Sequence, residues 1–97
     1  MSGRAEMVVK INRALGALGL PDWDEVQGAK FMFYDSDHAV IGQVTSIGFS
    51  PDEGIRLYVS VRRFCGINVR RLELQGGTWL AMSEDSKEVR HGVLELL

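Results

Sequence analysis

The clearest pattern in this chain is an alternation of apolar and polar residues that begins after Gly54. Every second residue is aliphatic, and the aliphatic positions are Ile55, Leu57, Val59 and Val61. Successive side chains of a β-strand point to opposite faces of a sheet, so this alternation predicts a strand whose aliphatic face lies in the core.

Shorter segments of the same kind continue from Ala29 to the C-terminus. Turn-forming residues separate them, at Asp35–His38, Ser50–Gly54, Gly76–Gly77 and Ser83–Lys87. The strands that we expect are centred on Phe31 and Phe33, Val40–Phe49 with a bulge near Gly48, Ile55–Val61, Val69–Leu74, Thr78–Met82 and Val89–Leu96. Short strands joined by tight turns predict an all-β fold, a small closed antiparallel barrel of about six strands, in which no sheet edge is left unpaired.

The segment Ala5–Leu20 is ambiguous. Apolar residues recur there at the spacing of an amphipathic helix: Met7, Val8, Ile11, Leu15 and Leu18. Gly16 and Gly19 oppose that reading, because glycine inside a helix costs about 1 kcal/mol relative to alanine. We therefore expect a short helix over roughly Ala5–Asn12 and an extended chain after it, followed by a loop over Trp23–Gly28 whose tryptophan packs on the barrel.

Length and composition favour one ordinary globular domain over residues 1–97. The chain has 45% hydrophobic and 25% charged residues, and no apolar run approaches the length of about 20 residues that a membrane helix needs. Cys65 is the single cysteine and can form no internal disulfide, and Met1–Lys10 carries no apolar core of a signal peptide. We expect a cytoplasmic protein that does not contact a membrane.

Candidate catalytic chemistry is sparse. His38 and His91 have no nucleophile placed beside them in the sequence, and we expect both at exposed turns. Cys65 is interpreted as a small buried residue, and Asp35 and Asp37 as turn-forming residues around one serine. No second cysteine or histidine pair has the spacing of metal ligands, and the glycines form no phosphate-binding loop. The pattern predicts no catalytic residues and no metal site.

The stretch Val40–Pro51, with the strand that follows it, resembles a family signature. The matching residues are Gly42, Val44, Thr45, Ser46, Ser50, Pro51, Ile55, Tyr58 and Val59. They are similar to the pattern G-x-V-T-S-x-x-x-S-P, a short loop and then I-x-L-x-Y-V. That pattern is found in the C-terminal β-barrel of the glycine-cleavage T-protein (aminomethyltransferase) family and its folate-binding tRNA-modifying relatives.

The resemblance implies a non-catalytic barrel domain. In that family the tetrahydrofolate site and the catalytic acid belong mainly to a large N-terminal region, on which the barrel packs. The resemblance thus implies that this chain holds no cofactor alone, that tetrahydrofolate belongs to a parent protein, and that its partner is a folate-binding region of the same or another chain. The domain would then support one-carbon transfer without catalysing it.

The candidate interface combines the end of the predicted hairpin with neighbouring basic residues: Thr45, Ser46, Phe49, Ser50, Arg62 and Arg63. A Thr-Ser pair and a Ser-Pro step fix a loop through side-chain to backbone hydrogen bonds, and Phe49 would be the apolar anchor.

Four arginines fall within ten positions: Arg62, Arg63, Arg70 and Arg71. With Tyr58 and Trp79 close by, they could hold a nucleic-acid backbone, a folate polyglutamate tail or an acidic protein. The other interpretation is a solvated strand face with cross-strand pairs to Glu73 and Glu84. An alternative function is therefore a small SH3-like or OB-like barrel that binds nucleic acid or protein as an adaptor; a stand-alone enzyme ranks third.

Overall fold

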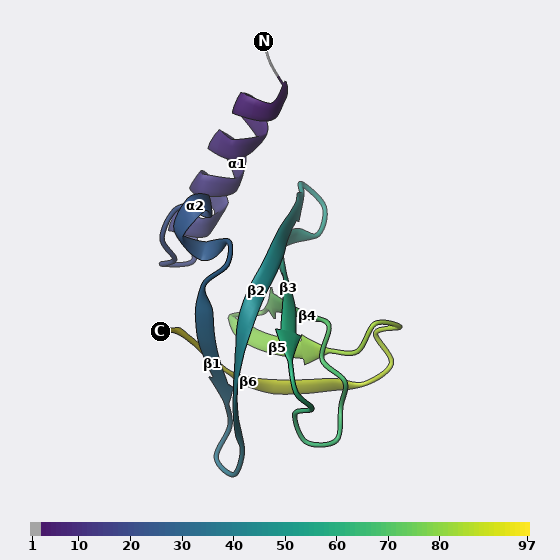
Figure 1. The fold of residues 1–97 in the computed structure, drawn as a ribbon. Helices are drawn as coiled ribbons and strands as arrows, with labels where there is room; N and C mark the ends of the chain where they lie inside the picture. Colours follow the sequence, from purple (N-terminus) through teal and green to yellow (C-terminus); the bar gives the residue numbers. More distant parts are fainter. Residues whose placement is uncertain (1–2) are drawn as a thin grey trace.

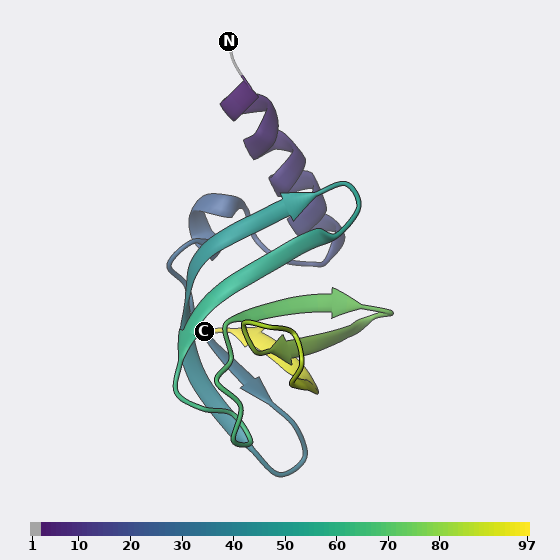
Figure 2. The same cartoon turned by 90° about the vertical axis from the view of Figure 1, so that its right-hand side faces the viewer.

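Six antiparallel strands close into a barrel in the order β1-β2-β3-β4-β5-β6 (Figures 1 and 2). This is a computed structural model that describes residues 3–97, with Arg4 described by its backbone alone. Met1 and Ser2 lie outside the described residues. They are the first two residues of Met1–Lys10, the segment in which no export signal was expected. The elements are α1 Gly3–Ala17, α2 Trp23–Val26, β1 Lys30–Tyr34, β2 Ala39–Ser50, β3 Gly54–Val61, β4 Arg71–Gln75, β5 Thr78–Met82 and β6 Val89–Leu96. The predicted all-β barrel with a helix at its N-terminus is confirmed.

Each strand pairs with its neighbours in sequence, and β1 with β6 completes the circle. The interior is filled by the face of β3 that the alternation predicted: Ile55, Leu57 and Val59 are buried, and Val61 packs against the same core. Phe31, from β1, also points into the core and is fully buried. The predicted orientation of β3 is thus confirmed.

The helix α1 is longer than predicted, and the extended segment expected after Asn12 is wrong. Ile11 and Leu15 are buried and Leu18 packs against the core, so the apolar face continues beyond the expected end and α1 extends to Ala17. The helix stops because Leu20 N–H donates to the Leu15 carbonyl and Gly19 N–H to the Gly16 carbonyl, both at 3.0 Å. This pair of bonds is the Schellman motif, which places glycine just after the helix in a left-handed conformation, as Gly19 is at φ 75°. Only one of the two opposing glycines therefore lies in the helix.

The two glycines should respond oppositely to alanine. Gly16 is helical and an added methyl group would meet nothing within 4 Å, so Gly16→Ala should stabilise the protein by about 0.5 kcal/mol. Gly19→Ala should destabilise it by about 1 kcal/mol, because a left-handed backbone is strained for alanine. Urea unfolding of the two variants beside the parent measures this difference. A stabilised Gly19→Ala would contradict the helix end described here.

The segment after α1 contains one helical turn where a loop was expected. In α2 the Trp23 N–H donates to the Asn12 side-chain oxygen at 2.7 Å, which ties this turn to α1. Val26 is fully buried. Trp23 is partly buried against the hydrophobic core, which includes residues of α1 and α2 as well as of the barrel.

The long strand β2 is interrupted between Val44 and Ser46, where its register against β3 shifts. Thr45 is the additional residue, so the bulge expected near Gly48 lies earlier; Gly48 pairs regularly with Arg56. A bulge increases the local bend of a strand, which helps a twelve-residue strand follow the wall of a small barrel.

The connection between β3 and β4 covers one end of the barrel. Phe64 and Ile67 exchange backbone hydrogen bonds of 3.0 and 2.9 Å, and both side chains are buried. The ring of Phe64 meets that of Phe33 edge to face at 5.1 Å. Val69 was expected in a strand. It lies in this connection instead, since β4 begins at Arg71, and its side chain is buried.

Candidate functional site

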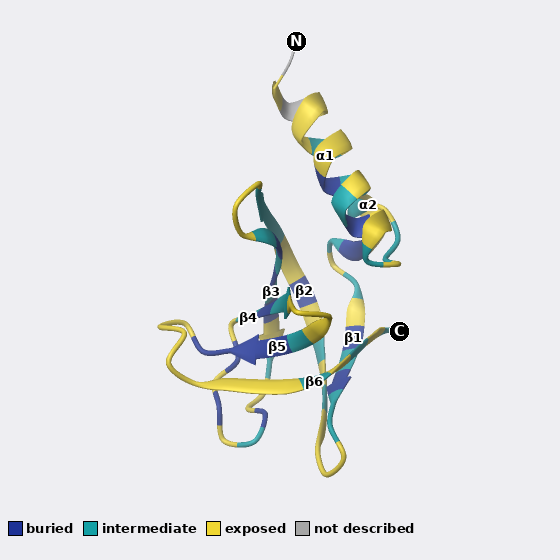
Figure 3. Cartoon of the chain, turned by 180° about the vertical axis from the view of Figure 1, so that it is seen from behind, coloured by how far each residue is buried: buried dark blue, intermediate teal, exposed yellow. Residues whose placement is uncertain are grey.

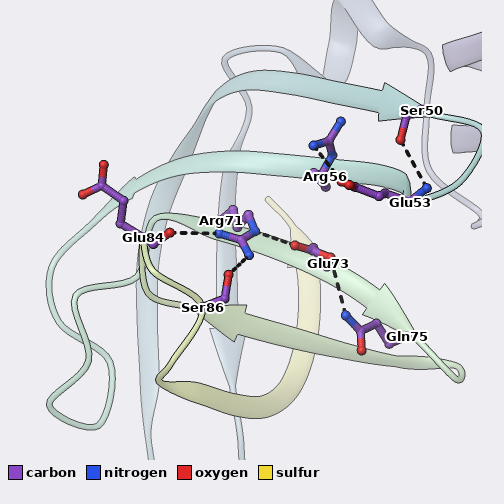
Figure 4. Close-up of polar contacts among 8 residues, drawn as sticks. All are labelled: Ser50, Glu53, Arg56, Arg71, Glu73, Gln75, Glu84 and Ser86. Atoms are coloured by element: carbon purple, nitrogen blue, oxygen red, sulfur yellow. Dashed lines mark hydrogen bonds and ion pairs between the residues drawn. The ribbon is translucent and has the colours of Figure 1, made fainter.

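The end of the β2–β3 hairpin is held by its own side chains. Ser50 Oγ accepts a hydrogen bond from the Glu53 N–H at 3.2 Å, and the Glu53 carboxylate pairs with Arg56 at 2.9 Å (Figure 4). This is the side-chain to backbone fixing that the Ser-Pro step predicts. Phe49 is partly buried against the core, so only part of its side chain is available as an apolar anchor.

The bulge at Thr45 is fixed from both sides. Its Oγ1 donates to the Tyr58 carbonyl at 3.2 Å, while its own carbonyl accepts from the Gln27 side chain at 2.6 Å. Ser46, the next residue, is exposed. Of the Thr-Ser pair, Thr45 therefore fixes the bulge through hydrogen bonds, and Ser46 is exposed on the surface.

Arg62 and Arg63 lie at the opposite end of β3 from the hairpin end. Val61 pairs with Gly42, whereas Ser50 pairs with Gly54. An eight-residue strand separates the two ends by on the order of 20 Å. Both arginines are exposed, and Arg63 donates to the Gly66 carbonyl at 2.9 Å. The candidate interface residues thus fall into two groups.

Arg71 is bound within the protein (Figure 4). Its guanidinium donates to the Glu73 carboxylate and the Ser86 hydroxyl, and reaches the Ser83 and Glu84 carbonyls at 3.4 and 3.5 Å. Glu73 lies in the same strand and Glu84 contributes backbone, so neither forms the expected cross-strand pair of charges. Arg71 serves to fasten the β5–β6 turn to β4.

Arg70 is surrounded by acidic residues. It borders a depression of about 360 Å³ with Glu84, Asp85 and Glu88. Tyr58 is aligned with Arg71, while Trp79 is aligned with Leu74 further along β4, so the ladder does not place the two aromatic residues opposite one another. Acidic neighbours thus offset the charge of Arg70, whereas Arg62 and Arg63 are exposed and consecutive at the end of β3.

The β1–β2 turn is built around Asp35. Its Oδ1 accepts the N–H groups of Asp37 and His38 at 2.8 and 2.7 Å, and these two bonds hold the pKa of Asp35 below its usual range. The predicted role of Asp35 as a turn-forming residue is confirmed, as is the exposed turn position of His38. His91 is exposed but lies in β6, and Cys65 is only half-buried.

One outer face of the barrel is apolar and exposed. Cross-strand alignment places Ile41 beside Met32, and Ala39 and Val93 on either side of Tyr34. These five residues are called the outer β1–β2–β6 face. Ile41 is 61% exposed and Val93 48%, and Figure 3 shows β6 exposed over most of its length. Sequence reasoning concentrated on the core side of these strands and missed this face.

Polar side chains adjoin the outer β1–β2–β6 face, and one of them, Glu95 on β6, is aligned with Met32. Tyr34 donates from its hydroxyl to the Glu95 carboxylate at 2.9 Å, and this bond raises the pKa of Tyr34. Along β2 the exposed side continues from Ile41 through Gln43 to Thr45 and Ser46. An apolar patch within a polar rim is the usual composition of a protein-binding surface.

Neither helix within residues 3–97 has the length and apolar character that crossing a membrane would require. Comparisons of the chain with models of known protein families, with curated proteins and with solved structures found no match.

Proposed function

We propose that this chain is a non-catalytic β-barrel domain that acts by packing on a folate-binding region, in a protein like the aminomethyltransferases or the folate-binding tRNA-modifying proteins. The domain supports one-carbon transfer by completing the protein around tetrahydrofolate, and contributes no reacting group. The folate-binding region belongs to the same or to another chain. The proposal rests on the resemblance over Val40–Val59 and on the surface described above.

The observation that carries the proposal is the outer β1–β2–β6 face. Large aliphatic side chains such as Ile41 and Val93 are exposed there, on the two strands that flank β1, and covering them removes apolar area from water at about 25 cal/mol per Å². Thr45 and Ser46 extend the same side of β2 toward the hairpin end. The surface is a sheet face rather than a pocket, which suits a folded partner better than a small molecule.

A second function, an adaptor that binds nucleic acid, is favoured by one observation. Arg62 and Arg63 are consecutive and both exposed at the end of β3. Two cations make a weak electrostatic site, since each phosphate contact contributes roughly one unit to the salt dependence of binding.

Titration calorimetry tests the proposal. We expect the chain to bind the folate-binding region of a glycine-cleavage T-protein prepared without its own barrel. Ile41→Lys should weaken that binding by about tenfold or more, because it places an unpaired charge in the apolar contact. Thr78→Lys, at an exposed strand position at the start of β5, is the matched control and should bind as the parent does.

Two outcomes contradict the proposal. The first is that the chain does not bind the folate-binding region although its circular-dichroism spectrum shows an intact fold. That result would refute the proposal that the barrel packs on such a region. Micromolar binding of tetrahydrofolate by the isolated chain would make the barrel itself the folate site, because half of a site offers too few contacts for that affinity. Salt-dependent RNA binding that disappears in the Arg62→Glu, Arg63→Glu double variant would support the adaptor function instead.

A further inference from the structure

Two connections meet at the end of the barrel opposite the β2–β3 hairpin end (Figure 1). The β1–β2 turn brings Asp35 and His38, and the β3–β4 connection brings Cys65. One ligand atom of each residue lies within 4.8 Å of those of the other two. A carboxylate, an imidazole and a thiol are therefore gathered from segments distant in the sequence.

The distances within the cluster are close to those between ligands of one metal ion. Cys65 Sγ lies 3.9 Å from Asp35 Oδ2, and His38 Nδ1 lies 3.5 Å from Asp35 Oδ1. Zinc bonds of about 2.0–2.3 Å place tetrahedral ligands about 3.3–3.5 Å apart. The three ligand atoms lie within 4.8 Å of one another, so side-chain shifts on the order of 1 Å bring them to such spacing.

We propose that Asp35, His38 and Cys65 bind one Zn²⁺ ion, with water in the fourth position. Thiolate and imidazole are ligands of zinc and similar transition metals, whereas Mg²⁺ and Ca²⁺ require oxygen ligands. Zinc binding converts the Cys65 thiol to a thiolate and releases its proton to solvent. The thiolate and the carboxylate together then balance the two charges of the ion.

The surroundings position the ligands. Two backbone N–H groups fix Asp35 through Oδ1, which leaves Oδ2 directed toward Cys65. The imidazole of His38 lies edge to face with Phe64, with ring centres 6.3 Å apart. Hydrogen bonds to a ligating carboxylate are typical of the outer shell of metal sites.

The cluster opens into a depression of about 640 Å³ that Asp37, Gly66 and Arg90 also line. Asp37 adds negative charge beside the ion, and Arg90, which is exposed, opposes it. Arg63 is bonded to the Gly66 carbonyl nearby and adds a second positive charge. The open side gives water or a small anion access to the fourth position.

The ion would cross-link the two connections. Asp35 and Cys65 are separated by 30 residues, and a ligand that binds only the folded state stabilises it. The zinc site uses none of the five residues of the outer β1–β2–β6 face, and the proposal does not rest on a folate-binding partner.

The experiment uses the whole chain, treated with a chelator, dialysed and kept reduced with a phosphine. Co²⁺ is added first, because a cobalt–thiolate bond gives a charge-transfer absorption band. Zn²⁺ then displaces it, and a zinc dye measures the affinity. We expect the band in the parent chain, its loss on adding Zn²⁺, and a higher melting temperature with Zn²⁺ than without.

Variants test each ligand without unfolding the chain. Cys65 has a left-handed backbone at φ 52°, so Cys65→Gly removes the thiol and relieves strain; the cobalt band should vanish while the fold persists. Asp35→Asn keeps an oxygen for the two backbone N–H groups and, like His38→Ala, should weaken Zn²⁺ binding by about tenfold or more. Asp52→Asn, an exposed residue of the β2–β3 turn at the other end of the barrel, and His91→Ala are the controls and should bind as the parent does.

Three results would overturn the zinc site. They are the absence of a cobalt band in the reduced parent chain, a band that survives in Cys65→Gly, and equal losses of affinity in the ligand variants and the two controls. The first would leave the cluster as a hydrogen-bonded group of side chains that holds no metal.

Discussion

Replacing Leu57 by alanine should lower the free energy of unfolding by about 2–4 kcal/mol. Leu57 is fully buried and is aligned with Ile47 on β2 and Leu72 on β4, so its side chain lies where three strands meet. Truncation removes apolar contact and leaves a cavity that closed strands cannot easily fill. A domain of this size has a total stability of roughly 5–15 kcal/mol, so the loss is a large share.

Urea unfolding followed by circular dichroism measures the change, and Ser60→Ala serves as the control because Ser60 is an exposed residue of the same strand. The control should change stability by less than about 0.5 kcal/mol. A similarly small effect of Leu57→Ala would mean that β3 presents its other face to the core.

Alanine at Gly42 should destabilise the barrel by about 1–3 kcal/mol through overpacking. A methyl group there would overlap the Val61 side chain, and would lie 2.7 Å from the Ser60 carbonyl oxygen and 2.9 Å from the ring of Phe31. The carbonyl belongs to the backbone of β3 and cannot rotate away. Glycine at this position therefore allows β2 to approach its neighbours closely.

Gly48 is the matched control, since it lies in the same strand without such crowding. An added methyl group would come within 3.0 Å of the Tyr58 ring, the movable end of a side chain, so Gly48→Ala should cost less than Gly42→Ala in the same unfolding assay. Equal costs would show that strand propensity, rather than close approach, determines the effect. Gly42 also belongs to the resemblance signature, and its packing gives a reason for glycine there that does not involve folate.

Strand positions followed from local pattern, because alternation depends only on which side of a strand each residue faces. β3 was predicted in this way, and Val89–Leu96 was predicted with the bounds of β6. Helix α1 was underestimated because Gly16 and Gly19 carried equal weight as helix breakers. Their difference, one inside the helix and one just beyond its end, depends on the hydrogen bonds that terminate it.

Side-chain clusters were harder to predict, since they depend on which segments the fold brings together. The local turn chemistry of Asp35 was evident from its neighbours. Its approach to Cys65 depends on the β1–β2 turn and the β3–β4 connection meeting at one end of the barrel. The spacing of residues along the sequence does not predict that meeting. The partial burial of Phe49 was not predicted for the same reason, because the core against which it packs is formed by several elements.

The pairing of β1 with β6 has a consequence for how the chain folds. Every other strand pair joins neighbours in sequence, whereas the Tyr34–Glu95 contact spans 61 residues. Closing so long a loop carries a larger entropic cost than forming a hairpin. We expect the five local pairings to form first and this seam last. Until it closes, β1 and β6 present unpaired edges that can add strands from other molecules, so the last step of folding is also the one that protects the chain from aggregation.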